Sequence, residues 1–496
     1  MANYSIGKVA EITGGKLTGN AEIVIQHLLI DSRSAAANPS ALFFAIKGKN
    51  HDGHRYISEL YQRGVRAFVV SEQPVTTKFP EAGFIVVPDA LQALHELARY
   101  HREQYTCAVV AISGSNGKTI VKEWLFHCLS DKFSITRSPK SYNSQVGVPL
   151  SLMLLDENTS LGIFEAGISF PGEMERLRQM IRPDVGIFTN IGEAHQENFT
   201  DTEQKVTEKL KLFYHCQTLI YCADHEIINK VVRQTPELQK VKLLTWSVTG
   251  KADIMISHIA QETQGTSFQV TYLNETSNIR IPFTDAASLE NAMHCAALML
   301  FFKMNREEVI ARMHDLPPVA MRLEQKSAIN GCTLINDSYN SDYNSLSIAL
   351  DVLNRQFQHK NKTLILSDIL QSSKHPDELY LRVATLIRGK GITRIIGIGS
   401  EIHKNAALFD LPGKFFETTD AFISSFTPED FNREAILLKG ARSFEFEKIA
   451  SLLEQKKHTT RIEINLNALV HNLNYFMSLL KPGTKTLVMV KALSYG

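Results

Sequence analysis

Residues 111–124 read AISGSNGKTIVKEW, an apolar run followed by a glycine-containing loop and the start of a helical pattern. A phosphate-binding loop of the P-loop type reads G-x-x-x-x-G-K-[ST]; Ile112 stands at its first glycine, while Gly117, Lys118 and Thr119 keep the rest. A strand, such a loop and a helix in succession direct backbone N–H groups at a phosphate. The stretch therefore predicts nucleotide binding, with Lys118 as a cation and Thr119 as a Mg²⁺ ligand; the alternative is a glycine turn with a surface lysine.

Composition limits what surrounds this loop. The chain has 496 residues, about three times the usual size of a domain, so we expect three domains or slightly more. Lys plus Arg (53) nearly balance Asp plus Glu (52) without long runs of like charge, which disfavours nucleic acid and membranes as partners. Six cysteines without C-x-x-C spacing argue against a disulfide framework or a zinc site. With no signal-peptide pattern and no membrane-spanning apolar run, we expect a soluble cytoplasmic protein acting on small molecules.

Strand and helix patterns alternate outward from the loop. Residues 1–105 predict a small α/β domain that ends in a charged helix. Residues 106–317 predict a mostly parallel sheet with helices on both faces, built on CAVVAIS, LGIFEAG and DVGIFTNIG. Residues 318–456 predict a third α/β domain from TLINDS, KTLILSD, TRIIGIG and EAILLKG. Residues 457–496 begin a new strand–helix–strand pattern, which is too short to bury a core alone.

Three further titratable residues of the second domain are candidates for chemistry. Glu165 and His195 follow predicted strands, and ligand sites in open parallel sheets lie at the carboxyl ends of strands, so both suit metal ligands near the loop. Each also has a plain interpretation, a solvated carboxylate for Glu165 and a satisfied histidine for His195. Lys209 lies in the charged helical pattern DTEQKVTEKLKLF, where a lysine is usually solvated.

Several motifs, in order, resemble the ATP-dependent Mur ligases, and within that family the members that add D-alanyl-D-alanine. They are GSNGKTIVKEW, DSR with LFFAIKGKNHDGHRYI, NSQVGVPLSL, EAG followed by PGE, TNIGEAH, SLENAMHCAA and DSYNSDYNSLSIALDVL. The resemblance covers about residues 1–456. It implies a three-domain fold in which a central P-loop ATPase-like parallel sheet is flanked by two smaller α/β domains.

The resemblance also implies a reaction. An ATP-dependent ligase would turn the carboxylate of UDP-MurNAc-tripeptide into an acyl phosphate, which D-alanyl-D-alanine would attack to form a peptidoglycan precursor. Phosphorylation supplies the leaving group that a carboxylate lacks, and Mg²⁺ with Lys118 would neutralise the transferring charge. Alternatives are another acyl-phosphate ligase of the Mur or folylpolyglutamate type, and a regulatory P-loop nucleotide switch that hydrolyses without transfer.

Site residues follow from the resemblance by position. The implied catalytic residues are Lys118, Lys209 and His195, and the implied metal ligands are Thr119, Glu165, His195 and Lys209, the last as a carbamylated lysine. The implied ATP-binding residues are Gly114, Ser115, Asn116, Gly117, Lys118, Thr119, Asn291, Arg322, Asp337, Tyr339 and Asn340. The implied UDP-substrate residues are Asp31, Ser32, Arg33, Lys47 and Gly48, for which a tight turn with a structural ion pair is the alternative. Lys211, Tyr343 and the segment 367–375 depart from the family pattern.

The end of the chain resembles a different enzyme. RIEINLNALVHNL and MVKALSYG, within residues 457–496, resemble the start of alanine racemase, with Lys491 at the position of the lysine that carries pyridoxal phosphate. Such a β/α barrel needs ~250 residues. We therefore expect a truncated start of a barrel, a full-length protein that is a bifunctional ligase and racemase, and no racemase activity in this chain.

Overall fold

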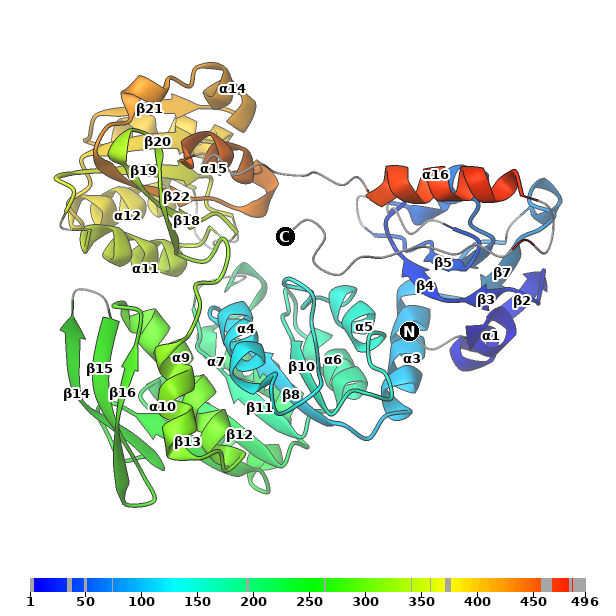
Figure 1. Cartoon of the computed structure of the whole chain (residues 1–496), viewed down its shortest axis with the longest axis horizontal. Helices are drawn as coiled ribbons and strands as arrows, with labels where there is room; N and C mark the ends of the chain where they lie inside the picture. The colour runs from blue at the N-terminus through cyan, green and yellow to red at the C-terminus, as the bar shows by residue number, and fades with distance from the viewer. Residues whose placement is uncertain are drawn as a thin grey trace.

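The computed structural model describes residues 4–33, 38–48, 51–73, 75–192, 196–262, 265–339, 341–356, 358–370, 376–455, 466–480 and 484. Their strands form three large sheets that follow one another along the chain, plus a two-stranded ribbon near the N-terminus (Figure 1). No helix in these ranges is long and apolar enough to cross a membrane.

The first sheet has five strands, and helices cover both of its faces. The elements of this region are β1 (Tyr4–Ser5), α1 (Ile6–Thr13), β2 (Lys16–Gly19), β3 (Val24–Ile25), β4 (His27–Leu29), β5 (Ala41–Phe44), α2 (Ile57–Gln62), β6 (Ala67–Val70), β7 (Gly83–Val86) and α3 (Ala90–Glu103). The strand order is β2-β7-β6-β5-β4, and only β2 runs antiparallel. Leu42 and Phe44 of β5 face α1 and α3, whereas Phe43 faces α2, because side chains alternate across a strand.

The second sheet has nine strands and carries the glycine loop. Its region contains β8 (Ala108–Ser113), α4 (Lys118–Leu129), β9 (Ile135–Arg137), α5 (Gly147–Leu152), β10 (Leu161–Glu165), α6 (Glu173–Ile181), β11 (Val185–Phe188), α7 (Thr202–Leu210), β12 (Thr218–Cys222), α8 (Glu226–Gln234), β13 (Lys242–Ser247), β14 (Ile254–Glu262), β15 (Gly265–Tyr272), β16 (Glu275–Ile281), α9 (Ala286–Phe301) and α10 (Arg306–His314). The order is β16-β15-β14-β13-β12-β11-β8-β10-β9. The strands from β9 to β14 pair in parallel, whereas β15 and β16 extend the sheet antiparallel.

Strand β8 shows why an unbroken apolar run forms the centre of this sheet. Val110 and Ile112 pack with α4 and α9 on one face, and Val109 and Ala111 pack with α5 to α8 on the other. Since both faces are covered, residues 109–112 of the strand are all apolar rather than alternately apolar and polar. Burying each Val or Ile stabilises the fold by about 1.5–3 kcal/mol relative to exposure. The loop that follows β8 is thereby anchored in the core.

The third sheet has six strands. Its elements are β17 (Glu324–Ser327), β18 (Thr333–Asp337), α11 (Tyr343–Asn354), β19 (Asn361–Ser367), α12 (Pro376–Arg388), β20 (Arg394–Ile398), α13 (Ser400–Lys404), β21 (Gly413–Phe416), α14 (Thr419–Ser424), β22 (Glu434–Lys439) and α15 (Glu447–Leu453). The order is β17-β18-β22-β19-β20-β21, with only β17 antiparallel. Helices α11 and α12 cover one face, and α14 and α15 lie on the side of the other.

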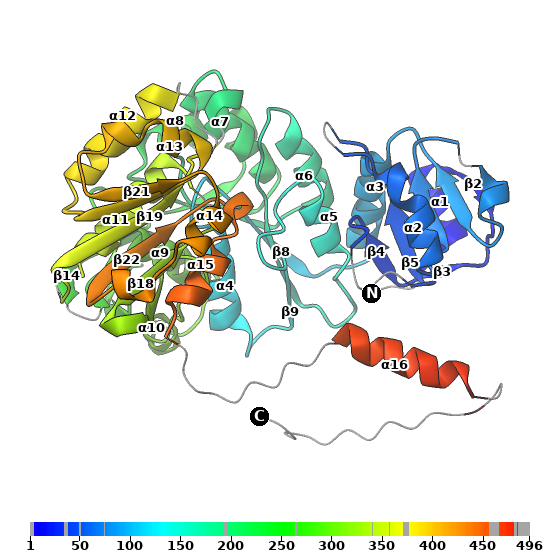
Figure 2. The ribbon, with the colours of Figure 1, turned by 90° about the horizontal axis from the view of Figure 1, so that it is seen from above.

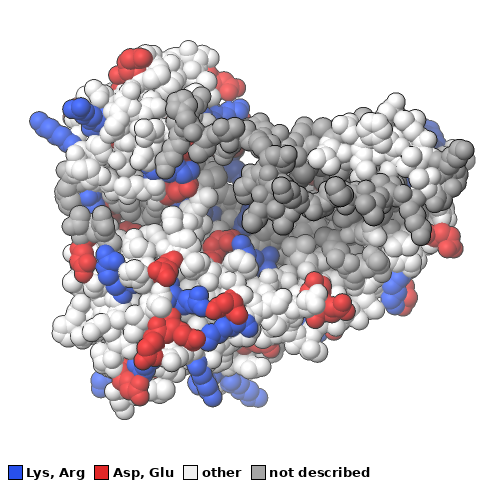
Figure 3. All heavy atoms as spheres, viewed as in Figure 1, with Lys and Arg blue, Asp and Glu red and all other residues white. Residues whose placement is uncertain are grey.

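The multidomain α/β architecture expected from the sequence is confirmed, while the exact domain limits stay a prediction. In Figure 1 the third sheet lies above the second, and the first sheet lies to the right. Helix α16 (Leu466–Ser478) stands apart from all three sheets in Figure 2. Acidic and basic side chains are intermixed on the face shown in Figure 3.

Candidate active site

The loop between β8 and α4 has a backbone that two glycines permit. Gly114 has φ +144° and Gly117 has φ +83°, values that residues with a side chain rarely adopt. A Cβ on Gly114 would lie 2.0 Å from Thr189 Oγ1, and one on Gly117 would lie 2.1 Å from Asn291 Oδ1. The loop therefore packs directly against the end of β11 and against α9.

Asn190, just beyond β11, holds the first half of this loop. Its backbone oxygen accepts a hydrogen bond from Ser115 N at 2.8 Å, and its Oδ1 accepts one from Asn116 N at 2.9 Å. The second half differs, because Gly117 is the N-cap of α4 and no described side chain caps the N–H groups of the first turn. These N–H groups and the positive end of the helix dipole form the surface that an anion such as a phosphate would meet.

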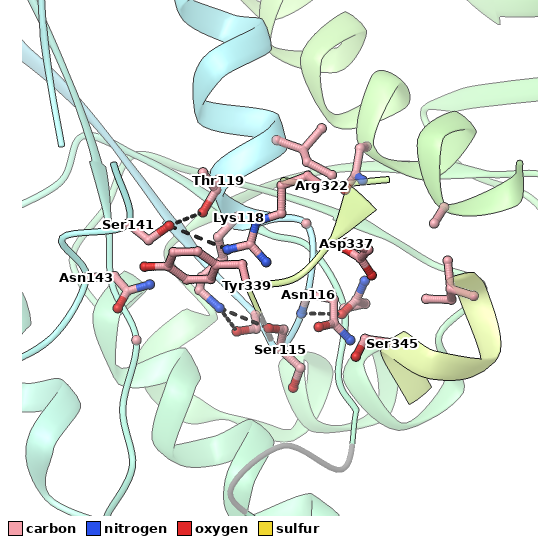
Figure 4. Close-up of a pocket in the computed structure, with 18 of the residues that line it drawn as sticks. Ser115, Asn116, Lys118, Thr119, Ser141, Asn143, Arg322, Asp337, Tyr339 and Ser345 are labelled. Carbon is pink, nitrogen blue, oxygen red and sulfur yellow. Dashed lines mark hydrogen bonds between the residues drawn. The ribbon is translucent and has the colours of Figure 1, made fainter. Parts of the chain in front are cut away.

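Lys118 folds back over the loop. Its Nζ donates to Gly114 O at 2.8 Å and to Ser115 O at 3.0 Å (Figure 4). Loss of hydration lowers the pKa of Lys118 to about 8, although the nearby Glu165 carboxylate opposes this shift. The side chain therefore lies at the loop, where phosphate oxygens would restore its charge.

Oxygen ligands gather beside the start of α4. Thr119 Oγ1 donates to Glu165 Oε2 at 3.1 Å and lies 3.0 Å from Ser141 Oγ (Figure 4). Asn143 Nδ2 donates to the same Glu165 oxygen at 3.3 Å. Mg²⁺ binds hard oxygen ligands and is usually held by one or two carboxylates together with substrate phosphates. The hydroxyl and carboxylate oxygens of this group fit such an ion.

Lys122, which the sequence analysis missed, forms an ion pair with Glu165. Glu165 and Lys122 are both fully buried, and Lys122 Nζ lies 3.1 Å from Glu165 Oε1, an ion pair outside hydrogen-bond geometry. Lys122 Nζ also donates to Ser138 O at 2.8 Å. A buried carboxylate is costly unless a cation compensates it. The pairing leaves Glu165 Oε2 for Thr119, so Glu165 is not the solvated strand-end carboxylate of the plain interpretation.

Lys209 is only 4% exposed and so is not a solvated lysine either. Its Nζ donates to Gly114 O at 3.1 Å, the carbonyl that Lys118 also contacts. Burial, followed by the neighbouring charges of Lys118 and Lys205, lowers the pKa of Lys209 well below its ordinary value. The amine is therefore biased towards its neutral, nucleophilic form.

The third sheet supplies the opposite wall of the cavity. The Arg322 guanidinium lies 4.2 Å from the centre of the Tyr339 ring (Figure 4). Asp337, at the end of β18, forms an ion pair of 2.7 Å with the buried Lys439 at the end of β22. The predicted residues that line this one cavity are Gly114, Ser115, Asn116, Gly117, Lys118, Thr119, Lys209, Asn291, Arg322, Asp337 and Tyr339.

Three predicted site residues lie outside the described part of the chain: His195, Asn340 and Lys491. Their roles stay predictions.

The predicted UDP-binding residues lie beside the N-terminal sheet and not on this cavity. Arg33 Nη2 and Nε contact the two oxygens of Asp31 at 2.7 Å and 2.9 Å, which lowers the pKa of Asp31 to about 2. Lys47 pairs with Glu72 at 3.0 Å. The ion pair expected if Asp31 and Arg33 only stabilise a tight turn is thus present. Both this pair and the Lys47–Glu72 pair are exposed, so a ligand can reach them.

Asp52, His54 and Glu72 are close enough together to surround a metal, but the imidazole is already engaged. His54 Nε2 accepts from Ser71 N at 3.0 Å, so the ring proton is on Nδ1, 2.7 Å from Asp52 Oδ1. A ring with both nitrogens occupied has no lone pair for a metal. The DGH segment instead ties its loop to the end of β6.

The three departures from the family pattern have structural contacts. Lys211 pairs with the buried Glu208 at 2.6 Å, and the Tyr343 ring lies 4.1 Å from the Arg382 guanidinium. Asp368, which follows β19, accepts hydrogen bonds from the first backbone N–H groups of α13, at 2.7 Å from Ile402 N. Asp368 thus caps α13; residues 371–375 of this segment lie outside the described ranges.

The sequence analysis also missed Asn190 and Lys439. Asn190 follows β11 and Lys439 ends β22, both at the carboxyl edge of their sheets, so the strand-end rule that singled out Glu165 would have found them. Lys122 offers no such signal, because its burial depends on packing against residues distant in the sequence.

These observations define a class of protein: a multidomain α/β protein with a phosphate-binding loop in a cavity between two sheets. Comparison with known proteins extends this. Residues 112–299 match the Mur ligase middle domain, and residues 24–102 match the catalytic domain of the Mur ligase family.

Individual relatives agree with these matches. UDP-N-acetylmuramoyl-tripeptide–D-alanyl-D-alanine ligase of Bacillus subtilis is 26% identical over 404 residues, which are 80% of this chain and 86% of that protein. MurF of Acinetobacter baumannii superposes with a TM-score of 0.79 at 22% identity, over 91% of this chain and 99% of that one. The MurF ligase of Thermotoga maritima, solved in complex with ADP, superposes with a TM-score of 0.71 at 19% identity, over 86% and 96% of the two chains. Two Mur ligase family models thus match separate parts of this chain, and the chain is an ATP-dependent, ADP-forming ligase.

Proposed function

We propose that this chain joins D-alanyl-D-alanine to UDP-MurNAc-tripeptide through an acyl phosphate, forming a peptidoglycan precursor. The observation that carries the proposal is the convergence of the glycine loop, Thr119 and the buried Lys209 on one cavity, with Glu165 Oε2 accepting from Thr119 Oγ1 at 3.1 Å behind its wall. The name and nearly full-length alignment of the Bacillus subtilis relative support this choice of substrates.

In the proposed reaction, a carboxylate oxygen of the tripeptide attacks the γ-phosphorus of ATP and ADP leaves. The dipeptide amine then attacks the acyl carbon, the nitrogen loses a proton, and inorganic phosphate leaves as the amide forms. Lys118 and the uncapped N–H groups of α4 hold the β- and γ-phosphates, where donors placed in advance stabilise the charge that develops.

The oxygens of Thr119, Glu165 and Ser141 fit Mg²⁺, and we propose that the first two hold it, together with His195. Mg²⁺ would supply neutralisation of the phosphate charge. Lys122 positions Glu165 for this role by engaging its second oxygen.

We further propose that Lys209 carries a carbamate. Its neutral amine would add to the carbon of CO₂ and lose a proton, giving an anion that can accept or orient Mg²⁺. The charges around it favour this exchange, because Lys118 and Lys205 repel an ammonium at this position and would attract a carbamate. The change relieves the electrostatic conflict of three clustered lysines.

The remaining predicted residues complete the proposed substrate contacts. Asn291 would reach the adenine, Arg322 the phosphates, and Asp337, Tyr339 and Asn340 the third-domain side of the nucleotide. The proposed contacts to the UDP part of the substrate are Asp31, Ser32, Arg33, Lys47 and Gly48.

Phosphate release tests the proposal. With Mg-ATP and UDP-MurNAc-tripeptide, release should require D-alanyl-D-alanine, and mass spectrometry should find the UDP-pentapeptide. Release indifferent to the dipeptide would favour a nucleotide switch. Release that responds to another amine, or to a folate substrate with glutamate, would favour a different acyl-phosphate ligase.

A second candidate function concerns residues 457–496. We propose that they begin a racemase-type barrel with Lys491 as the pyridoxal phosphate lysine, which would make the full-length protein bifunctional. Helix α16 supports this, because it carries large exposed apolar side chains, namely Leu469, Val470, Leu473, Tyr475, Phe476 and Met477. Exposed apolar patches commonly mark surfaces that a further structure covers. Stoichiometric Schiff-base absorbance from pyridoxal phosphate on this 496-residue chain would contradict the expectation that the part present is inactive.

A further inference from the structure

Arg442 is an exposed arginine at the carboxyl end of the third sheet that no described acid neutralises. It opens the short 3₁₀ helix η9 (Arg442–Phe444), which follows β22. The other cation at this strand end, Lys439, is buried and paired with Asp337 at 2.7 Å. Arg442 therefore retains donors for an external anion.

The position of Arg442 relates it to the cavity. Its guanidinium lies 5.8 Å from the centre of the Tyr339 ring, over which Arg322 lies at 4.2 Å. Tyr339 and Arg322 line the nucleotide cavity, and Arg442 does not, so Arg442 stands beyond its third-domain edge. An arginine over an aromatic ring has a defined orientation and keeps its planar fork of N–H donors.

The backbone under Arg442 is fixed. Ala441 N donates to Ser367 Oγ at 2.9 Å, which ties the end of β22 to the end of β19. A Cβ on Gly440 would lie 2.5 Å from the Phe446 ring, so the chain there packs tightly. Such anchoring reduces the ordering cost when a side chain binds a ligand.

We propose that Arg442 binds the C-terminal carboxylate of the acceptor dipeptide, an inference that rests on the proposed ligase function. Four anionic groups must be held. In the proposed function the ATP phosphates have the glycine loop, the UDP diphosphate has the N-terminal sheet, and the reacting tripeptide carboxylate must lie beside the γ-phosphate and Mg²⁺. The acceptor carboxylate has no assigned cation, and Arg442 lies beside Tyr339, a residue of the cavity wall. A guanidinium fork matches a carboxylate with two parallel hydrogen bonds. Arg442 thereby selects an acceptor with a free carboxylate.

Steady-state kinetics of Arg442→Gln test this assignment. The KM for D-alanyl-D-alanine should rise roughly 10- to 100-fold, the usual range for lost charge-assisted hydrogen bonds. The KM values for ATP and UDP-MurNAc-tripeptide should stay unchanged. Arg442→Lys keeps the positive charge but loses the planar pair of N–H donors. Its KM for D-alanyl-D-alanine should therefore lie between those of wild type and Arg442→Gln. The matched control is Arg433→Gln, an exposed arginine at the opposite end of β22, which should behave as wild type.

The C-terminal amide of the dipeptide separates this role from a structural one. Wild type should discriminate against the amide by about the same factor that Arg442→Gln loses, and Arg442→Gln should treat the two acceptors alike. Persistent discrimination in that variant overturns the assignment. A rise in the KM for ATP alone assigns Arg442 to a phosphate instead. If wild type shows no dipeptide-dependent phosphate release, the proposed function fails, which is distinct from a failure confined to the variant.

Discussion

At the scale of the residue, Lys118 has a charge that changes near neutral pH. Its pKa is lowered to about 8, so the unliganded loop loses the ammonium as pH rises through that value. A bound phosphate favours the charged ammonium form of Lys118. Above the pKa of Lys118, nucleotide binding must therefore be accompanied by uptake of a proton. We expect ATP affinity to fall by up to about tenfold per pH unit above pH ~8. Calorimetric titrations in two buffers of different ionisation enthalpy measure both the affinity and the proton uptake.

The pH dependence of folding stability that Lys118 causes is a separate effect. Between about 8 and the ordinary lysine pKa of 10.5, the unfolded chain holds the proton that folded Lys118 has lost, so stability should rise with pH across this window. Lys118→Arg keeps its charge at every pH and serves as the control, with weaker but pH-independent nucleotide binding. If the ATP affinity of wild type does not change across this pH window, Lys118 is not the group that takes up the proton.

Lys209 supports a second prediction at this scale. Lys209→Ala should keep the fold but lower turnover roughly hundredfold or more, since it removes the proposed carbamate from the site. A short carboxylate such as acetate should restore part of the activity by occupying the vacated space. Wild type prepared in ¹³C-bicarbonate should show a carbamate carbon signal that the variant lacks.

The control for Lys209→Ala is Lys230→Ala, an exposed lysine on the neighbouring α8 that pairs with Glu203. It should retain full turnover. Wild-type turnover of Lys209→Ala would refute the carbamate proposal.

At the scale of the element, the parallel strands could be predicted because burial on both faces gives them continuous apolar runs, as in β8 and β22. The antiparallel extension by β15 and β16 was not predicted, since the buried residues of these strands alternate with less buried ones and form no such run. Some residues of the candidate site could likewise be predicted from the sequence, and others could not. The motif and the strand-end rule indicate Thr119 and Glu165, but the burial of Lys122 and Lys209 depends on tertiary packing that no local pattern reports.

The strand–loop–helix unit makes Gly117 the critical position of its element. Gly117→Ala should destabilise the protein by about 1–3 kcal/mol from its positive φ and should further displace Asn291, whose Oδ1 would lie 2.1 Å from the new methyl group. Nucleotide affinity should fall as well, because the first turn of α4 is re-aimed. Chemical denaturation and calorimetric ATP titration measure the two effects.

Gly172→Ala separates strain from collision. Gly172 is the N-cap of α6 with the same φ of +83°, but no described atom lies within 4 Å of the position that an alanine methyl group would take there. This variant should therefore incur the conformational cost alone and bind ATP normally. Equal effects of the two substitutions would show that the contact with Asn291 is unimportant.

At the scale of the whole molecule, side chains join the three sheets at places far apart in the sequence. Arg355 of α11 donates to Thr284 O before α9, which joins the third sheet's region to the second. Trp124 Nε1 of α4 donates at 2.7 Å to Pro317 O, in the segment that leads from α10 to β17. On the other side, two histidines of α3 contact the second domain. His95 Nε2 donates to Gln145 O at 2.6 Å, and His101 Nε2 donates to Leu155 O at 3.0 Å.

This α3 contact predicts a loss of stability in acid. Burial lowers the pKa values of His95 and His101 below the ordinary 6.5, so the unfolded chain takes up protons that the folded chain excludes. The contribution of these two histidines to folding stability is intact above pH ~6.5. It falls as pH drops from the pKa of the unfolded chain to the lower pKa of the folded chain.

Urea denaturation at pH 7.5 and 5.0 measures this effect. The free energy of unfolding should decline less for His95→Gln/His101→Gln than for wild type, because glutamine donates to the same carbonyls without titrating. The exposed His314→Gln should match wild type at both pH values. If the double variant declines as steeply as wild type, other groups cause the acid sensitivity, and the contact between α3 and the second domain does not depend on neutral imidazoles.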